Sequence, residues 1–398
     1  MMSGAAAPRV LVVTKRLGVG GAERHLAQVL PELRAKGIDV ALFVLERGGE
    51  LEANLAATGV TIEGVSPNGS RWRDLVRAGR ALARCIRRWQ PDLVHFFLPE
   101  AYLVGSAVAM VVGYRRCVMS RRSLSHYQQG RPWFARLERL MHRRTLALLG
   151  NSLAVVEELI AESGDASKVG LIHNGVEIPT MSGEARERAR DRLGLDDGAF
   201  VMVVVANLIP YKGHADLVAA LAGIAHRLPK AWYLLLVGRD EGVGAGLRTQ
   251  AASHGIAEHI VFLGECKNVE EPLQAADLAL LVSHQEGFSN ALLEAMAHGL
   301  AVIATAIGGN CDAIDDGSSG RLVPVQAPAR LGEAILELSR DADLRQQLGA
   351  AARERAVACF SQSACIEHYL RLYRGFAELG QRPVQVIIDG AASNVLSR

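Results

Sequence analysis

Short runs of Val, Leu and Ile alternate along the chain with longer segments in which apolar residues recur every three or four positions. The first run, "RVLVVTK", begins at Arg9, and "AERHLAQVLPELRAKG" follows it with a helical period that ends at Gly37. Uninterrupted β-branched runs are typical of strands buried on both faces, and helices between successive strands imply parallel pairing. The pattern therefore predicts an α/β fold with parallel sheets.

The alternation occurs in two series. The first continues with "DVALFVLE" and "PDLVHFF", and the second contains "FVMVVVAN", "AWYLLLVG", "HIVFLG", "ADLALLVS" and "GLAVIAT". Pro, Gly and Ser residues around 175–183 separate the series and are typical of a linker. We predict two Rossmann-like domains, a C-terminal helix that packs back toward the first domain, and a tail, with the boundaries 1–178, 179–360, 361–378 and 379–398.

Parallel sheets of this kind bind ligands beyond the carboxyl ends of their strands. In a chain with two such domains, the natural binding site is the cleft between them. We therefore expect two sheets that face a central cleft, with the reactive residues in the loops that follow the strands.

The composition is that of a globular protein with an uneven distribution of charge. The net charge is only +2 over 398 residues. Residues 1–180 contain 24 Lys and Arg against 16 Asp and Glu, whereas the remainder contains 20 against 26. The basic first half indicates either an ordinary solvated surface or a surface that meets something anionic.

Three features of the sequence bear on location. The six cysteines form no CxxC pair, which favours reduced cytosolic thiols over disulfides or zinc ligands. The N-terminal residues run into a strand pattern without a signal-peptide cleavage region. The longest smooth apolar run, "AYLVGSAVAMVVGY", is shorter than the roughly 20 residues of a membrane-spanning helix. We expect a cytoplasmic protein that could also bind peripherally to the inner face of the membrane.

The first strand leads into a glycine-rich loop. The backbone amides of Gly18, Gly20 and Gly21, together with the N-terminus of the following helix, can hold a phosphate. A dinucleotide-binding fingerprint would place a third glycine where Glu23 stands and would use Glu46 to bind the ribose. The match is poor, and it leaves open a tight structural turn and the NAD site of an oxidoreductase.

A lysine follows the first strand of the second series, in "VVVANLIPYKGHADL". Lys212 lies between Pro210 and Gly213, directly before a helix. A cation there can bind a diphosphate that also lies at the helix N-terminus. The alternative is an ordinary exposed lysine.

The stretch "EGFSNALLEAMAHGL" places Glu294 in an otherwise apolar helix, which we expect to be buried, capped by Ser289 and ended by Gly299. A buried carboxylate needs a partner. That partner is either His298, four residues on, or the two hydroxyl groups of a ribose. Glu286, followed by the amides of "GFSN", suits a sugar diphosphate.

With these residues, the chain resembles the retaining GT-B glycosyltransferases of family four. Glu286 and Glu294 match the E-x7-E motif of that family, and "GGAE", "IHNGV", "P-x-KG" and "GLAVIATAIGGNCDAIDDGSSGRLV" occur in the family's order. The resemblance covers residues 8–377. It implies a hexosyltransferase that moves a hexose or N-acetylhexosamine from a nucleotide-diphosphate sugar, with UDP favoured, to a lipid-linked, lipopolysaccharide-type or polysaccharide-type acceptor.

The resemblance also implies roles for individual residues. Glu294 would hold the nucleotide ribose, Glu286 the hydroxyls of the transferred sugar, and Lys212 the leaving diphosphate. His126, in "SRRSLSHYQ", would contact the transferred sugar from the first domain. Further donor contacts would come from the glycines of the first domain and the amides after Glu286, namely Gly20, Gly21, Gly287, Phe288, Ser289 and Asn290.

One position departs from the family pattern. Asn207 stands where the family commonly has an arginine that grips phosphate, so the diphosphate site must rely on Lys212 or on a neighbour such as Arg121 or Arg122. The pairs Asp196–Asp197 and Asp315–Asp316 lie in Gly-flanked loops that do not suggest a metal site. We expect no metal and no cofactor, because cations and amides can stabilise the leaving diphosphate directly.

Residues 101–150 contain nine arginines and a single acid, Glu138. Apolar side chains between them (Trp133, Phe134, Leu137, Leu140, Met141) complete an amphipathic basic helix. Such a helix either lies on an anionic bilayer or packs its apolar side on its own domain. We expect a glycolipid or growing glycan as acceptor and no nucleic-acid partner. The residues expected on the acceptor or membrane face are Arg121, Arg122, Arg136, Arg139 and Arg143.

Two other interpretations share the fold. One is a nucleotide-sugar epimerase, and the other is a sugar-binding subunit that lost catalysis together with the arginine at position 207.

Overall fold

The computed structural model describes residues 7–196, 198–266 and 268–378. These residues form two compact units, and each is a Rossmann-like α/β domain with one parallel sheet. The chain passes from unit 1 to unit 2 after Gly175 and returns after Ser361, close to the boundaries at 178 and 360 that the sequence suggests. The tail expected at 379–398 lies outside the described residues.

Unit 1 contains a seven-stranded parallel sheet in the order β3-β2-β1-β4-β5-β6-β7. The strand order runs outward in both directions from β1, so the loops after β1 and β4 diverge at the carboxyl edge and leave room for a ligand. The strands are β1 (Arg9–Thr14), β2 (Asp39–Val44), β3 (Thr61–Gly64), β4 (Leu93–Phe97), β5 (Cys117–Arg121), β6 (Ala147–Gly150) and β7 (Val169–Leu171).

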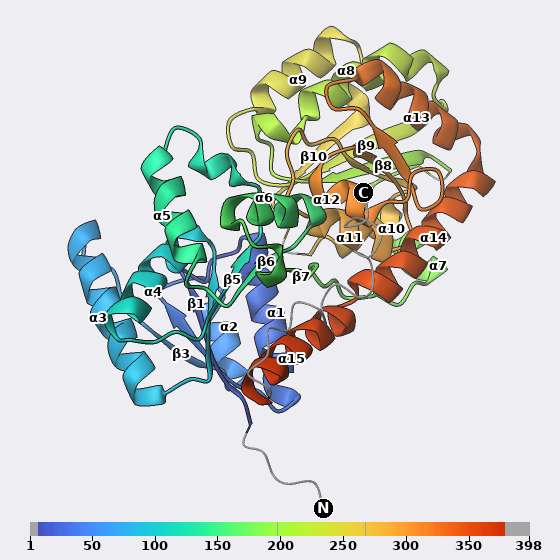
Figure 1. Cartoon of the computed structure of the whole chain (residues 1–398). Helices are drawn as coiled ribbons and strands as arrows, with labels where there is room; N and C mark the ends of the chain where they lie inside the picture. The colour runs from blue at the N-terminus through green and yellow to red at the C-terminus, as the bar shows by residue number, and fades with distance from the viewer. Residues whose placement is uncertain (1–6, 197, 267, 379–398) are drawn as a thin grey trace, which may run out of the picture. The chain divides into compact units, whose positions relative to one another are not determined.

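Helices cover both faces of this sheet (Figure 1). One apolar core joins the sheet to α1 and α15, and the other joins it to α3, α4 and α6. Both faces are therefore dry, as the uninterrupted apolar strands predict. The helical segments are α1 (Gly21–Ala35), α2 (Glu52–Ala57), α3 (Arg71–Trp89), α4 (Pro99–Val111), η1 (Ser125–Gln128), α5 (Pro132–His142), α6 (Leu153–Ser163), η2 (Ala166–Lys168) and α15 (Gln362–Glu378).

Unit 2 repeats this design with six parallel strands in the order β10-β9-β8-β11-β12-β13, so its switch point lies between β8 and β11. The strands are β8 (Phe200–Val205), β9 (Trp232–Val237), β10 (Ile260–Gly264), β11 (Leu278–Leu281), β12 (Ala301–Thr305) and β13 (Arg321–Val323). The helical segments are α7 (Gly183–Leu193), η3 (Pro210–Lys212), α8 (His214–Ile224), η4 (Ala225–Arg227), α9 (Gly244–Ser253), η5 (Ala257–His259), α10 (Glu270–Ala275), α11 (Asn290–Ala297), α12 (Gly308–Ala313), α13 (Pro328–Arg340) and α14 (Ala342–Phe360).

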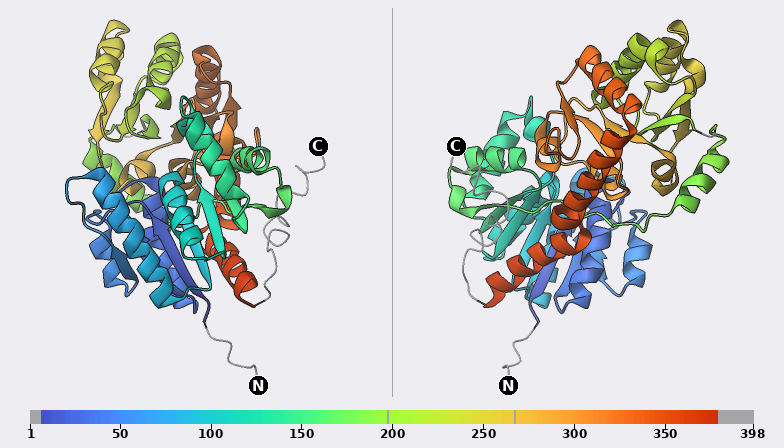
Figure 2. Two further views of the ribbon diagram at one scale, coloured as in Figure 1. Left: turned by 60° about the vertical axis from the view of Figure 1, so that its left-hand side comes forward. Right: turned by 90° about the vertical axis from the view of Figure 1, so that its right-hand side faces the viewer.

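Buried polar contacts fasten α15 to unit 1. The α15 helix packs along α1 and β4 (Figure 2). At this contact, Tyr369 Oη lies 3.1 Å from His25 Nε2, and Tyr373 Oη lies 2.8 Å from His95 Nδ1. The other nitrogen of His95 contacts Ser120 Oγ at 2.8 Å. Burial lowers the pKa of both histidines, to about 3 for His95, so the rings are neutral at physiological pH. None of the described helices is both long and apolar enough to cross a bilayer.

These neutral histidines predict a stability that falls in acid. The folded-state pKa of His95 is about 3, and burial lowers that of His214 in unit 2 to about 4. Both values lie below the unfolded value, so the unfolded chain binds more protons as the pH falls below about 6.5. We expect the free energy of unfolding to decrease toward pH 4, by at most roughly 1.4 kcal/mol per pH unit for each histidine.

Urea unfolding between pH 7.5 and 4.5 measures this slope. The variant His95→Gln should flatten it, whereas His254→Gln, at an exposed position, should leave it unchanged. A His95→Gln slope equal to that of the unmodified protein would contradict the assignment.

Candidate functional site

The switch point of unit 2 brings together two residues that the sequence singles out. Lys212 follows β8, Glu286 follows β11, and their side chains form an ion pair between Lys212 Nζ and Glu286 Oε1. The side chains are only 17% and 11% exposed. Ser283 Oγ donates a second hydrogen bond, of 2.8 Å, to the same carboxylate oxygen. Lys212 is therefore not an ordinary exposed lysine.

The two loops that carry this ion pair are locked together. Gly213 has a φ of +73°, and a Cβ atom there would lie 2.0 Å from the Val282 carbonyl oxygen, so only glycine fits. The His284 amide donates to the Tyr211 carbonyl at 2.7 Å, and His284 Nε2 lies 2.7 Å from Asp216 Oδ2. The backbone thus fixes the position of Lys212 relative to the end of β11.

The Glu286 loop also rests on the glycine pair that opens α12. The Gly309 amide donates to the Gly287 carbonyl at 2.9 Å. A Cβ atom at Gly308 would lie 2.2 Å from the Glu286 carbonyl oxygen, and one at Gly309 would lie 2.3 Å from the Phe288 ring. Two adjacent glycines after a strand are typical of such close packing, but the sequence alone does not identify the loop that they contact.

Helix α11 begins at Asn290, and Ser289 Oγ accepts the Leu292 amide at 3.4 Å, so the expected N-cap is confirmed. The expectation that Glu294 is buried is wrong. The helix buries the two residues before Glu294 and the three after it but leaves Glu294 only half-buried. Its face of α11 lies at the margin of the apolar core, where a carboxylate also reaches solvent.

The alternative pairing of Glu294 with His298 is not what the structure shows. His298 Nδ1 donates to the backbone carbonyl of Glu294 at 2.8 Å, and its Nε2 has no hydrogen-bond partner among the described residues. Burial lowers the pKa of His298, so its ring is neutral at pH 7. His298 therefore closes the end of α11 and does not neutralise the carboxylate.

Asn207 lies exposed beyond the end of β8, in a small polar cluster. Its Nδ2 donates to Glu241 Oε1 at 3.0 Å, and its Oδ1 accepts the Arg239 amide at 3.2 Å. Arg239 also donates to Glu241, at 2.8 Å. Arg239 therefore contacts Asn207 through its backbone amide and places its guanidinium on Glu241, and the sequence does not reveal this contact because Arg239 follows a different strand.

Asp196 and the Asp315–Asp316 pair belong to loops, as expected, and Asp197 lies outside the described residues. Within residues 7–196, 198–266 and 268–378, no three His, Cys, Asp or Glu side chains come together as a metal site would require.

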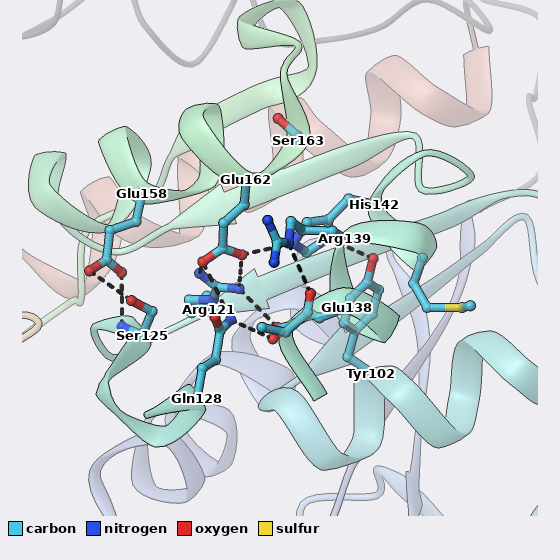
Figure 3. A network of polar contacts seen from close by, with 12 residues as sticks. Tyr102, Arg121, Ser125, Gln128, Glu138, Arg139, His142, Glu158, Glu162 and Ser163 are labelled. Atoms are coloured by element: carbon cyan, nitrogen blue, oxygen red, sulfur yellow. Dashed lines mark hydrogen bonds and ion pairs between the residues drawn. The ribbon is translucent and has the colours of Figure 1, made fainter. Parts of the chain in front are cut away.

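In unit 1, a buried cation organises the segment after β5 (Figure 3). Arg121 is 1% exposed, donates twice to Glu162 at 2.8 and 2.7 Å, and donates once to Glu138 at 2.9 Å. His142 Nε2 lies 3.2 Å from Glu162, and hydrogen bonds from His142 and Arg121 overcome burial to lower the pKa of Glu162 to about 2. The expectation that Arg121 lies on an acceptor or membrane face is wrong, because its charge is neutralised inside unit 1.

Glu138 and a further carboxylate, Glu158, hold the segment that contains His126. Glu138 accepts from Tyr127 Oη at 2.9 Å and from Gln128 Nε2 at 2.8 Å, while Glu158 accepts the Ser125 amide at 2.8 Å (Figure 3). His126 itself is exposed at the surface of this braced segment. The structure therefore gives His126 a fixed backbone, and its contact with a sugar stays a prediction.

Helix α5 turns part of its apolar side outward. Its only acid, Glu138, is buried against Arg121, whereas Trp133 is 65% exposed and Leu137 and Leu140 also face outward. The alternative in which the apolar side packs on its own domain holds in part, because Met141 is 4% exposed in the unit 1 core and Phe134 is half-buried. Arg136 and Arg139 are exposed on the same helix, and Arg143 is exposed directly after it.

A second basic helix went unnoticed in the sequence analysis. Helix α3 carries seven arginines, all exposed, beside Trp72, which is 77% exposed, and Val76. Within the described part of the chain, four of these arginines form no ion pair: Arg73, Arg80, Arg84 and Arg87. The arginines recur with a period of about 3.6 residues, which is the sequence pattern of a helix with a basic face.

The glycine loop after β1 leads directly into α1. The helix begins at Gly21, and its N-cap, Gly20, provides no side-chain hydrogen bond. A Cβ atom at Gly20 would lie 2.5 Å from Glu23 Oε2, so the acid at the expected third-glycine position occupies the space beside the loop. This geometry favours a turn over a dinucleotide-binding loop.

Comparison with known families and structures matches both units. The family model for glycosyltransferase family 4 matches residues 19–178, and that for group 1 glycosyl transferases matches residues 185–355. The HepE protein of Anabaena, solved with UDP and glucose, superposes with a TM-score of 0.81 over 92% of this chain and 99% of HepE, at 21% identity. The chain is a GT-B protein of the glycosyltransferase group 1 and family 4 type.

Relatives of this GT-B protein have diverse substrates in their names. D-inositol 3-phosphate glycosyltransferase of Streptomyces coelicolor is 30% identical over 52% of this chain and 51% of its own length. N-acetyl-alpha-D-glucosaminyl L-malate synthase of Bacillus anthracis is 28% identical over 55% of this chain and 58% of its own length. The chain thus spans little more than half the length of these relatives.

Close packing at the glycine pair yields a test of the site. The variant Gly309→Ala should force the Glu286 loop away, because the new methyl group would overlap Phe288 and Gly287. We expect the free energy of unfolding to fall by about 1–3 kcal/mol and the amides of residues 286–290 to exchange hydrogen faster.

Gly246→Ala in α9 is the matched control, because no atom lies within 4 Å of a Cβ atom there. Alanine should stabilise this helix interior by up to about 1 kcal/mol. If Gly309→Ala were as stable as this control, the glycine contact would not support the loop.

Proposed function

We propose that this GT-B protein is a retaining, metal-independent hexosyltransferase. It moves a hexose or N-acetylhexosamine from a nucleotide-diphosphate sugar, with UDP favoured, to a lipid-linked or polysaccharide-type acceptor. The observation that carries the proposal is the Lys212–Glu286 ion pair at the switch point of unit 2, directly before the N-terminus of α11. The donor is further supported by HepE, whose solved complexes contain UDP and UDP-glucose.

Without a ligand, Lys212 and Glu286 neutralise each other. A donor diphosphate would take Lys212 as its counter-ion and would also lie at the positive N-terminal end of α11. Glu286, still held by Ser283, would then accept hydroxyl groups of the sugar. The ion pair would thus hold both side chains in position until the donor binds, when Lys212 would contact the diphosphate and Glu286 the sugar.

The chemistry follows from where charge develops. Cleavage of the sugar–diphosphate bond leaves negative charge on the diphosphate and positive charge on the sugar. Lys212 and the α11 amides would stabilise the negative charge on the diphosphate, and the Glu286 carboxylate would stabilise the positive charge on the sugar. Glu294, half-buried on α11, would accept the two ribose hydroxyls.

A binding subunit without catalysis is the second candidate, because Asn207 is occupied by Glu241 and Arg239 and supplies no charge. Turnover of a labelled UDP-sugar separates the two candidates. Transfer or hydrolysis that survives EDTA supports the enzyme, whereas UDP binding without turnover supports the subunit.

The ribose assignment is tested by Glu294→Ala. Removing a charged hydrogen-bond partner costs roughly 1.5–3 kcal/mol, so UDP should bind about tenfold to a hundredfold more weakly and should raise the melting temperature less. The exposed Glu258→Ala is the control and should respond to UDP as the unmodified protein does. An unchanged UDP response in Glu294→Ala would remove the proposed nucleotide site.

We further propose that the exposed tryptophans and arginines of α3 and α5 bind an anionic bilayer, where a lipid-linked acceptor would be found. Tryptophan favours the headgroup region, and each arginine near an anionic surface adds about 1 kcal/mol. Liposome sedimentation at low salt should show binding to vesicles with anionic lipid and little binding to neutral vesicles. The double variant Arg80→Glu/Arg84→Glu should weaken sedimentation; equal partition onto both vesicle types would contradict the proposal.

A further inference from the structure

Arg122, the residue after β5, has a different environment from Arg121. Arg122 is half-buried, its guanidinium donates to the side-chain carbonyl of Asn174, and its charge lies near the Tyr369 hydroxyl. Nearby His25 and His95 are neutral, and the charge of Arg122 helps to lower their pKa values. All of these neighbours are uncharged.

Arg122 forms no ion pair with any described residue, although its neighbour Arg121 has two carboxylates. A guanidinium has five N–H donors, and the one described acceptor, Asn174 Oδ1, leaves donors available. A partly desolvated cation without a counter-ion is unfavourable unless an anion joins it. The guanidinium therefore provides a place for an oxyanion at the carboxyl edge of the unit 1 sheet.

Asn151, which follows β6, adds a hydrogen-bond acceptor that has no donor among the described residues. Its Nδ2 donates to the Arg122 carbonyl at 3.5 Å and to Asn174 Oδ1 at 3.3 Å, and both partners can only accept, which fixes the orientation of the amide. Asn151 Oδ1 is then buried without a hydrogen-bond partner among the described residues, in a side chain that is 2% exposed. An acceptor in this state needs a donor, such as a hydroxyl group.

We propose that Arg122 and Asn151 form an acceptor subsite that binds a phosphate or carboxylate group of the acceptor together with an adjacent hydroxyl group. Arg122 binds the oxyanion, and Asn151 Oδ1 accepts from the hydroxyl. The residues of this subsite all belong to unit 1, whereas Lys212 and Glu286 belong to unit 2. The inference rests on the proposed function, because it assigns the chemistry of the acceptor.

The test uses glycerol 3-phosphate as the probe and glycerol as the uncharged control, at constant ionic strength and with saturating UDP. Saturating UDP occupies the proposed diphosphate site, so a remaining response reports a second oxyanion site. Glycerol 3-phosphate should raise the melting temperature of the unmodified protein, and glycerol should not. The variant Arg122→Gln should need at least about tenfold more probe for the same shift.

Arg122→Lys keeps the charge without the planar fork and should fall between these two. Arg73→Gln, at an exposed arginine of α3, is the matched control and should respond like the unmodified protein. A probe response that UDP abolishes, or one that Arg122→Gln retains in full, would overturn the inference. A missing response to UDP itself would instead refute the donor site, and the difference between Arg122→Gln and the unmodified protein would still decide this subsite.

Discussion

The burial of one guanidinium, that of Arg121, determines much of the surface of unit 1. A cation at that depth is tolerable only with acids beside it, and removing one partner of such a pair typically costs about 3–5 kcal/mol. Glu138 and Glu162 supply the charge, and Glu138 must turn the face of α5 that carries it inward. As a consequence, Trp133, Leu137 and Leu140 of α5 face outward. Glu138 also accepts hydrogen bonds from Tyr127 and Gln128, which follow His126 in the sequence. An electrostatic requirement therefore overrides part of the hydrophobic pattern of this helix.

Unit 2 uses charge differently, because the proposed donor would replace one partner of its ion pair. Lys212 and Glu286 are held by backbone contacts that only glycines at 213, 308 and 309 permit, so the loops stay fixed while the side chains can exchange partners. Arg121 has no such freedom, since its two carboxylates are themselves buried or half-buried. The Arg121 ion pairs are therefore structural, whereas in the proposed functional pair a ligand would replace one of the two side chains.

The sequence was sufficient for the fold because the strands are uninterrupted apolar runs and each is followed by a segment with a helical period. It was also sufficient to place Lys212 and Glu286 at strand ends, since the loops after β8 and β11 flank the switch point. It was misleading for Glu294 and α5. The exposure of Glu294 depends on which face of α11 meets the core, and the orientation of α5 depends on Arg121, which lies on a strand that the period of α5 cannot reveal. Arg239 was missed for the same reason, because only strand pairing brings it to Asn207.

Arg121 and Arg122 show the limit of composition most clearly. The two residues are adjacent and chemically identical, and the sequence assigned them one role. Successive side chains at a strand end point in opposite directions, so one guanidinium reaches the carboxylates of α5 and α6 and the other reaches only neutral groups. Arg121, whose charge is neutralised by two carboxylates, has a structural role. Arg122, whose described neighbours are neutral, is available to an anionic ligand. This criterion depends on the position of every nearby acid, and only the three-dimensional structure supplies those positions.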